Sequence, residues 1–308
     1  MLQKGHEKKR KSKAGRKPYD PVLMFKVLIL QSLYNLADDQ VEYQIRDRLS
    51  FMRFLGLKIE EAVPDAKTVW LFRERLKRHG LIEPLFNRFA DVLEAQGYLA
   101  RQGQIIDASI VKAPIQRNRR EENENIKRGE VPADGSQNKR RQKDTQARWT
   151  KEHGKSYYGY KNHISVDAPH KFIRTYAVTP ANVHDSRVFD SILDMENADP
   201  QVWADSAYRS EQTEAALAGA GFESHIHEKA QSNAALSEEQ QTRNRERSKI
   251  RARVEHTFGS QQNEQGGKLV RTIGLARAAV KIGLMNLTYN LRRFVYLENR
   301  REGASAPA

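Results

Sequence analysis

The spacing of apolar residues changes near residue 104, and this change constrains the fold more than any other feature of the sequence. Before it, residues 20–98 contain only helical patterns, in four segments that begin near residues 20, 39, 64 and 83. Asp20-Pro21 is a typical helix start, and Gly80 is a typical helix end. After residue 104, short runs rich in Ile and Val alternate with helical segments. The sequence therefore predicts a small all-helical N-terminal domain followed by an α/β domain with a mixed sheet.

The second part of the chain contains runs typical of strands at residues 104–111, 157–166, 171–178, 201–205 and 222–228. The runs at 157–166 and 171–178 predict a hairpin, because the Asp and Pro between them suit a tight turn. Helices are expected at 185–195, after residue 205 up to 218, at 236–262 and at 276–298. Residues 117–155 are polar and rich in charge, which predicts a disordered or mobile insertion.

The formal net charge of +14 indicates a polyanionic partner. Residues 1–18 hold eight Lys or Arg against one acid, so this segment is either a solubilising tail or an arm that follows the DNA backbone through residues such as Arg16 and Lys17. The absence of cysteine excludes disulfides and thiolate metal sites. The chain shows no secretion signal and no apolar run of the ~18–20 residues that span a bilayer. We therefore expect a cytoplasmic protein that binds nucleic acid rather than membrane.

The helix expected at residues 64–78 has an unusually basic surface. Its apolar residues recur at i, i+3 and i+7 and face the core, while basic side chains occupy the other sides. Such a helix can lie against a DNA groove, although an ordinary solvated face explains the pattern equally well. The basic residues are Lys67, Arg73, Arg75, Lys77 and Arg78.

Three acidic residues have positions that favour a metal site. Asp107 lies in an apolar strand, where a carboxylate is costly unless a cation or hydrogen bonds compensate. Asp205 lies where a strand passes into a helix, the edge at which α/β sheets bind ligands. Glu255 borders the apolar stripe of residues 250, 254 and 258 on a helix. Each has an ordinary explanation alone: a turn, a helix cap, or a contact with Arg251. Together they form an oxygen ligand set that suits Mg²⁺ or Mn²⁺.

Six short segments carry a resemblance to a known family. They are Gly15-Arg16-Lys17-Pro18-Tyr19-Asp20-Pro21, Ile106-Asp107-Ala108-Ser109, Gly154-Lys155-Ser156-Tyr157-Tyr158-Gly159-Tyr160-Lys161-Asn162-His163, Thr179-Pro180-Ala181-Asn182-Val183-His184-Asp185-Ser186, Ala204-Asp205-Ser206-Ala207-Tyr208-Arg209 and Arg251-Ala252-Arg253-Val254-Glu255-His256-Thr257-Phe258-Gly259. With these segments in order over about residues 15–295, the chain resembles DDE transposases of bacterial insertion sequences, specifically the group named after insertion sequence five.

The resemblance implies a ribonuclease-H-like catalytic core behind a helical DNA-binding domain. It implies a basic disordered tail over 1–18, the helical domain over 19–100, the catalytic domain over 101–298 with a charged flexible insertion at about 115–155, and a disordered tail over 299–308. The family motif around the glutamate reads Tyr, two residues, Arg, three residues, Glu, six residues, Lys. Arg251 and Glu255 fit it, but Ser248 stands at the Tyr position and Gln262 at the Lys position. Lys268, six residues further on, is a candidate substitute for that lysine.

The resemblance also implies a mechanism. It places Asp107, Asp205 and Glu255 at the three metal-binding positions, where they would hold two Mg²⁺ or Mn²⁺ ions, with Asp107 shared and each of the other acids on one ion. Arg251 and Lys161 are candidates for clamping phosphate, and Arg16, Lys17, Arg73, Lys77 and Arg78 for contacting DNA elsewhere. The expected partners are double-stranded DNA, as terminal inverted repeats and target, and a second copy of the chain in the DNA complex. A nucleoid-associated location in the cytoplasm follows.

Three alternatives stay open on the sequence. A decayed transposase acting only as a DNA-binding protein is favoured by Gln262 and Ser248, and the intact acids argue against it. A metal-dependent DNA nuclease without strand transfer has the same residues. An RNA-binding protein follows from charge alone and leaves the acids unexplained. His225 and His227 share a strand face but are too few for a zinc site, so we interpret them as a polar strand face.

Overall fold

The computed structural model describes Leu2 and residues 17–98, 102–130, 137–152, 154–230 and 235–305. Most of the expected basic tail, including Arg16, lies outside the described residues. Among the helices described, none is both long and apolar enough to cross a membrane.

The N-terminal part is the predicted helical unit. Two of its helices begin where the sequence predicts, because the Asp20 carboxylate accepts a hydrogen bond from the Leu23 N–H at 3.0 Å and Asp65 accepts one from the Thr68 N–H at 2.6 Å. The single helix expected over 39–52 is wrong, because the extended backbone of Arg48 divides it into two helices. The helices are α1 (Pro21–Leu33), α2 (Asp38–Asp47), α3 (Leu49–Leu55), α4 (Ala66–Arg78) and α5 (Ile82–Ala95).

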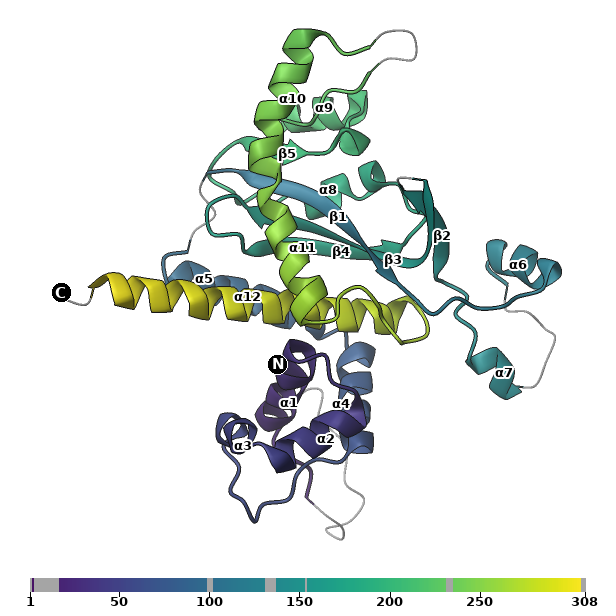
Figure 1. Ribbon diagram of the computed structural model, residues 1–308, viewed down its shortest axis with the longest axis vertical. Helices are drawn as coiled ribbons and strands as arrows, with labels where there is room; N and C mark the ends of the chain where they lie inside the picture. The colour runs from purple at the N-terminus through teal and green to yellow at the C-terminus, as the bar shows by residue number, and fades with distance from the viewer. Residues whose placement is uncertain are drawn as a thin grey trace.

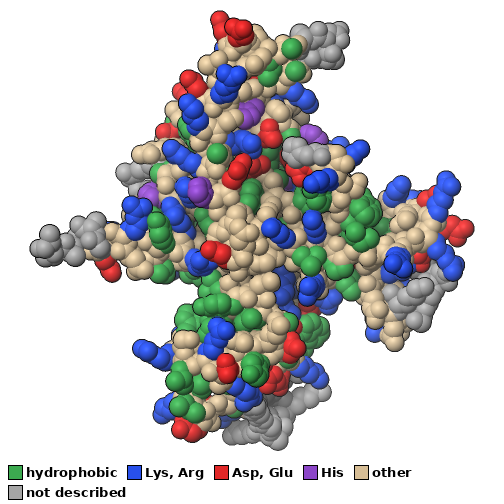
Figure 2. Space-filling model, viewed as in Figure 1, with side chains coloured by type: hydrophobic (Ala, Val, Ile, Leu, Met, Phe, Trp, Pro, Cys, Tyr) green, Lys and Arg blue, Asp and Glu red, His purple; other side chains and the backbone are tan. Residues whose placement is uncertain are grey.

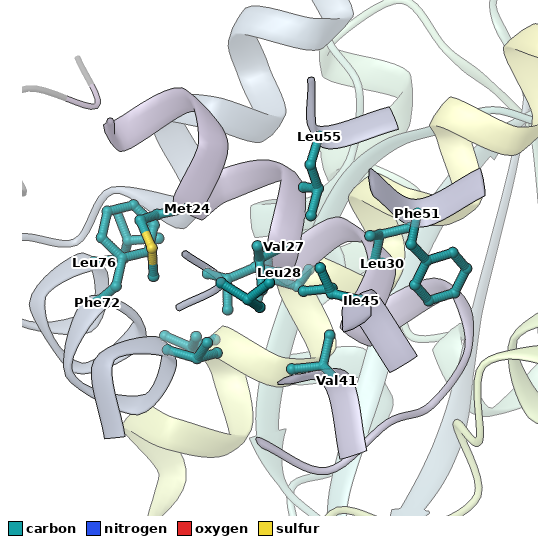
Figure 3. Close-up of a cluster of buried hydrophobic side chains, with 14 of the residues drawn as sticks. Met24, Val27, Leu28, Leu30, Val41, Ile45, Phe51, Leu55, Phe72 and Leu76 are labelled. Carbon is teal, nitrogen blue, oxygen red and sulfur yellow. The ribbon is translucent and has the colours of Figure 1, made fainter. Parts of the chain in front are cut away.

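The apolar core of this unit forms where α1 to α4 converge. Figure 3 shows that α1 lies at its centre, with side chains of the other three helices directed toward it. Two residues of the C-terminal helix, Val280 and Leu284, complete the same cluster. The helical unit is therefore joined to the rest of the molecule by a shared hydrophobic core.

A six-stranded mixed sheet forms the centre of the second part and confirms the predicted fold class. The strand order is β2-β3-β1-β5-β6, and β4 pairs with β3 as the second half of the expected hairpin. β1 runs antiparallel to β3 and parallel to β5. The strands are β1 (Gln104–Lys112), β2 (Arg148–Glu152), β3 (Lys155–Asp167), β4 (Ile173–Pro180), β5 (Gln201–Ala204) and β6 (Glu223–Ser224).

The expected disordered insertion is wrong for much of its described part. It contains α6 (Arg120–Lys127), α7 (Gln137–Arg141) and β2. Buried polar contacts hold it: Lys143 pairs with Glu122, and the Asp144 carboxylate accepts hydrogen bonds from the Tyr160 hydroxyl and from the Gly274 N–H. One of these partners, Gly274, lies 130 positions from Asp144 in the sequence, so the polar composition of the insertion alone did not indicate this contact.

Short helices connect the remaining strands, and three longer ones end the chain. The helix expected over 236–262 is broken at Ala252, and the expected C-terminal tail over 299–308 is helical as far as Ser305. Figure 1 shows α10 and α11 crossing one face of the sheet in succession, with α12 running between the sheet and the N-terminal unit. The elements are η2 (Asp185–Arg187), α8 (Phe189–Ile192), η3 (Ser206–Tyr208), α9 (Glu211–Gly219), α10 (Glu238–Arg251), α11 (Arg253–Glu264) and α12 (Leu275–Ser305).

Candidate active site

Two of the three predicted acids lie at the same end of two adjacent parallel strands, with Asp107 in β1 and Asp205 directly after β5. Ile106 of β1 is in register with Ala204 of β5, so the next residues, Asp107 and Asp205, follow side by side. Residues at equivalent positions of neighbouring strands point to the same face of a sheet. The fold thus brings together two carboxylates that are 98 positions apart in the sequence.

Asp107 is a partly buried acid held by one cation. Its Oδ2 accepts a hydrogen bond from the Arg251 guanidinium at 3.0 Å, and its Oδ1 accepts one from the Ala108 N–H at 2.8 Å. Burial raises the pKa of Asp107 to about 6, and the opposing effect of Arg251 does not cancel it. A carboxylate with this balance is short of positive charge.

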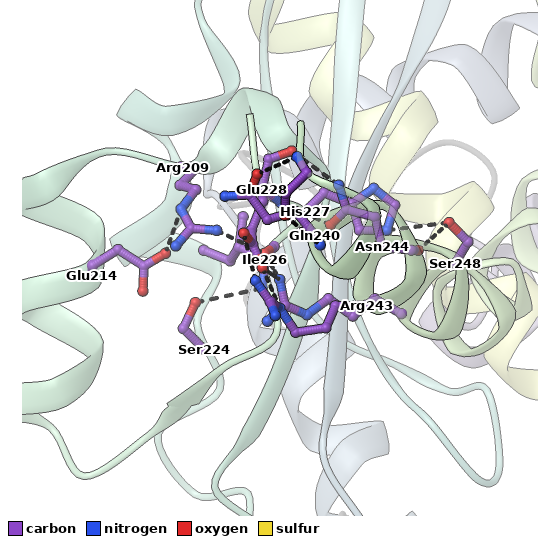
Figure 4. A network of polar contacts seen from close by, with 12 residues as sticks. Arg209, Glu214, Ser224, Ile226, His227, Glu228, Gln240, Arg243, Asn244 and Ser248 are labelled. Atoms are coloured by element: carbon purple, nitrogen blue, oxygen red, sulfur yellow. Dashed lines mark hydrogen bonds and ion pairs between the residues drawn. The ribbon is translucent and has the colours of Figure 1, made fainter. Parts of the chain in front are cut away.

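Asp205 directly follows β5 and caps η3, with its Oδ1 accepting a hydrogen bond from the Ser206 N–H at 2.5 Å. The Nδ1 atom of His227 lies 4.0 Å from the same oxygen, and its Nε2 atom lies 3.3 Å from the Ser248 hydroxyl. Figure 4 shows His227 and Ser248 in the polar network that fastens α10 to the end of the sheet, together with Glu228, Arg243 and Asn244. Ser248, at the family's Tyr position, is therefore in hydrogen-bond contact with a histidine that lies near Asp205.

Glu255 is exposed on the first turn of α11, which packs against β1. Its neighbours on α11 and residues of β1 line one cleft of about 430 Å³. Within this cleft Gln262 donates a hydrogen bond to the Ser109 hydroxyl at 3.1 Å. The cleft is lined by Ala108, Ser109, Ile110, Lys112, Glu152, Tyr157, Glu255, Phe258, Gly259, Gln262 and Lys268.

Two lysines, Lys112 and Lys268, line this cleft because the chain after α11 returns to β1. The Lys112 N–H donates to the Lys268 carbonyl at 3.0 Å, and the Val270 N–H donates to the Lys112 carbonyl at 2.9 Å. This pairing places two lysines side by side in sequence-distant segments. The Lys112 ammonium also lies over the Tyr157 ring, 5.1 Å from its centroid. Lysines and a tyrosine on one wall suit a nucleic-acid strand.

The residues fit a divalent metal by their donor chemistry. Carboxylate oxygens at the end of a sheet are the ligands that Mg²⁺ and Mn²⁺ prefer, and Asp107 is short of positive charge. Within the described ranges, no three His, Asp or Glu side chains are already arranged around one point that would hold an ion. Glu255 is the acid that would have to approach, since Asp107 and Asp205 are already neighbours.

The predicted DNA-contacting residues lie in different settings. Lys161 is paired with Asp185 at 2.7 Å, and Arg251 with Asp107. Arg73, expected to contact DNA from the basic face of its helix, is instead buried and binds both carboxylate oxygens of Asp38. Lys77 pairs with Glu74, whereas Lys17 and Arg78 are exposed. Figure 2 shows Lys and Arg side chains spread over this whole face, from the helical unit to the sheet.

The sequence interpretation missed three residues near the acids: Asp185, Tyr208 and His227. Asp185 and Tyr208 lie within segments quoted for the family resemblance, but only the fold brings them to Asp107. His227 was interpreted as part of a polar strand face, whereas it follows β6 and contacts Asp205.

Comparison with known families gives two matches that together cover most of the chain. Residues 99–291 match the family described as "Transposase DDE domain". Residues 2–75 match the family described as "Transposase domain (DUF772)". The first match contains the whole sheet with Asp107, Asp205 and Glu255, and the second contains α1 to α3 and most of α4. No solved structure matches the chain.

Proposed function

Since the chain belongs to the DDE transposase family, we propose that it cuts the ends of a transposable element and joins them to target DNA. The mixed sheet, its flanking helices and the helical N-terminal region agree with a ribonuclease-H-like catalytic domain of that family. The observation that carries the proposal is the pair Asp107, in β1, and Asp205, directly after the adjacent parallel strand β5, with Glu255 on the helix that packs against β1.

Asp107, Asp205 and Glu255 are the residues that would hold two Mg²⁺ or Mn²⁺ ions. When bound, such ions would supply an activated attacking oxygen and stabilise the charge on the leaving oxygen. Arg251 lies beside Asp107, at the end of α10 and four positions before Glu255, and would orient a phosphate at this site. Ser248 and His227 would hold Asp205 in place from the other side.

The DNA strand would leave the acids along the cleft lined by β1 and α11. Lys112 and Lys268 stand at its wall, and Tyr157 offers a ring on which an unpaired base can stack. Gln262, at the family's Lys position, is uncharged and occupied with Ser109. We assign its role to Lys268, because that residue lines the same cleft from a different segment.

The remaining partners follow from the reaction. Transposition joins two DNA ends, so the active species would be at least a homodimer on DNA, with terminal inverted repeats and target DNA as ligands. The protein would act in the cytoplasm on the nucleoid. Membership of the group named after insertion sequence five stays a prediction, as does the use of Lys17, Lys77 and Arg78 as DNA contacts.

The decisive experiment replaces Asp107 by Asn. Purified protein is incubated with Mg²⁺ and a DNA fragment that carries both ends of its own element. We expect cleavage by Asp107→Asn to fall by more than about 100-fold, because the substitution removes a metal ligand, while gel-shift affinity for the ends is retained. Equal cleavage by the variant would remove Asp107 from the mechanism.

A second candidate function is a DNA-binding protein that has lost catalysis. Ser248 and Gln262 favour it, because both family positions have changed and both side chains are engaged in other hydrogen bonds. Specific binding of element ends by wild-type protein, with no cleavage in Mg²⁺ or Mn²⁺, would establish this alternative. Cleavage without joining of the freed 3′ ends to a target plasmid would indicate a nuclease instead.

A further inference from the structure

Asp185 is a further acid next to the two strand-borne ones. It opens η2, which packs against η3, the turn that Asp205 caps. Because η2 packs on η3, Asp185 lies at the same end of the sheet as Asp205, which in turn follows the strand next to that of Asp107.

Asp185 is held by a cation of the fold in the same way as Asp107. Its Oδ1 accepts a hydrogen bond from the Lys161 ammonium at 2.7 Å, and the side chains of both residues are mostly buried. The Nδ1 atom of buried His163 lies 3.8 Å from the same oxygen. Arg251 and Lys161 therefore each pair with one acid of the group.

Tyr208 supplies an independent sign that this group is a site. Its side chain is 1% exposed, and its hydroxyl is buried without a hydrogen-bond partner. Burial, followed by the charges of Asp185, Asp107 and Asp205, raises the pKa of this hydroxyl well above its ordinary value, so it keeps its proton. A buried hydroxyl without a partner, in the η3 turn that Asp205 caps, is costly unless another state of the site engages it.

We propose that Asp185 is a fourth carboxylate of the divalent-cation site, and that Tyr208 is a positioning residue whose hydroxyl donates to a carboxylate of this group when a cation draws the acids together. This inference rests on the proposed function, because it assumes that Asp107 and Asp205 bind the cation. It assigns a role to the segment around Asp185, which the three-acid mechanism leaves without one.

The test measures Mn²⁺ binding to the full-length protein without DNA, by calorimetry and by the loss of the electron paramagnetic resonance signal of free Mn²⁺. Asp185→Asn keeps an oxygen that can accept from Lys161 but removes the charge. We expect it to raise the Mn²⁺ dissociation constant by about 10–100-fold, the range found when groups that support metal ligands are removed. Asp190→Asn, an exposed acid five positions further on, is the matched control and should bind Mn²⁺ as wild type does.

Tyr208→Phe separates a role in cation binding from a role in folding. It deletes only a hydroxyl that has no partner, so the thermal unfolding midpoint in EDTA should be unchanged or higher. The Mn²⁺ dissociation constant should nevertheless rise several-fold. This variant decides the matter even if Asp185→Asn folds poorly.

Asp107→Asn distinguishes the two levels of inference. If it abolishes Mn²⁺ binding while Asp185→Asn and Tyr208→Phe bind as wild type, the fourth acid and its donor are overturned and the three-acid site stands. If Asp107→Asn also binds Mn²⁺ as wild type, the cation site itself is overturned, and this inference with it. Weakened binding in all three, with Asp190→Asn unchanged, is the result we expect.

Discussion

At the scale of single residues, the Asp107 carboxylate carries a cost that the fold offsets only in part. Its pKa is raised from 3.8 to about 6, mainly by burial. Between about pH 4 and pH 6 the unfolded chain therefore releases a proton that the folded chain keeps, so the free energy of unfolding falls as the pH rises through this window. A residue kept at such a cost is better explained by chemistry than by packing.

Replacing Asp107 by Asn should stabilise the protein while it removes cleavage. At pH 7 in EDTA we expect the free energy of unfolding to rise by about 1–3 kcal/mol, because the buried charge is gone. At pH 4 the variant should lose this advantage, since the wild-type carboxyl is then protonated in the folded state. Urea denaturation at both pH values measures the difference, with Asp190→Asn as an exposed control. If the free energy of unfolding of the variant exceeds that of wild type by less at pH 7 than at pH 4, this account is contradicted.

Lys268 and Gln262 allow a paired test of the proposed DNA path. Each Lys that contacts phosphate adds about 0.9 to the slope of log affinity against log salt concentration. Lys268→Gln should lower this slope by about 0.9 for DNA that carries an element end, and Gln262→Lys should raise it by a similar amount. The slope is measured by fluorescence anisotropy between about 50 and about 300 mM salt. Unchanged slopes in both variants would place the strand elsewhere.

The residues of the site differed in how far the sequence could predict them. Asp107 and Asp205 could be predicted, because the local sequence pattern shows an acid within a strand or directly after one. The position of His227 near Asp205 depends on the pairing of β6 with β5. The local sequence pattern does not indicate that pairing. The same holds for the buried position of Arg73, because Asp38 lies on another helix. Charges that meet across elements are fixed by packing and not by spacing.

At the scale of elements, caps were predictable and interruptions were not. Asp20 and Asp65 cap the starts of α1 and α4, because each side chain accepts a hydrogen bond from the backbone N–H three residues later. The breaks at Arg48 and Ala252 involve residues without a breaking tendency. The break at Ala252 lies between Arg251, which reaches Asp107, and Glu255, which lines the cleft. It therefore lets two successive helices serve two parts of the site.

Gly159 is the element-scale position where the backbone itself limits substitution. Its φ is +154°, and a Cβ there would lie 2.3 Å from the Val111 carbonyl oxygen, on the strand that carries Asp107. Gly159→Ala should lower the free energy of unfolding. Backbone strain at this φ costs about 1–3 kcal/mol, and the clash of the new Cβ with the Val111 carbonyl adds to it. Gly219→Ala, in α9 with open space around it, should be neutral or slightly stabilising. Urea midpoints compare the two, and equal effects would contradict the reason given.

At the scale of the whole molecule, α12 connects the helical unit to the sheet. Its residues enter three separate apolar clusters, which include α1, the sheet and α11. Residues 282–290 are buried on all sides, because a helix packed between two layers has no solvent face there. Its buried polar residues find partners across the layers, as when the Asn286 amide bonds with Asn162 of β3. The two matched transposase domains are therefore one folded body.

An ion pair at the start of α12 gives this connection a pH dependence. Glu74 of α4 accepts hydrogen bonds from the Arg277 guanidinium at 2.7 and 3.1 Å, and Lys77 adds a second cation. The hydrogen bond from Arg277 is the main cause that lowers the pKa of Glu74 to about 2. Because the folded pKa lies below the ordinary 4.5, the stabilisation is complete above pH 4.5 and is lost as the pH falls through 2.

Glu74→Gln should therefore cost stability at neutral pH and progressively less in acid. At pH 7 we expect a decrease in the free energy of unfolding of about 1–2 kcal/mol, a range reduced for solvent screening around the partly exposed Arg277. The difference in free energy of unfolding between wild type and variant should narrow between pH 4.5 and pH 2.5. In this range the Glu74 carboxyl of the unfolded wild-type chain gains a proton, and the variant has no such group. Urea denaturation followed by tryptophan fluorescence, with Trp70 in α4 near this contact, measures the gap. A gap that stays constant over this range would show that the Glu74 charge does not hold α4 to α12.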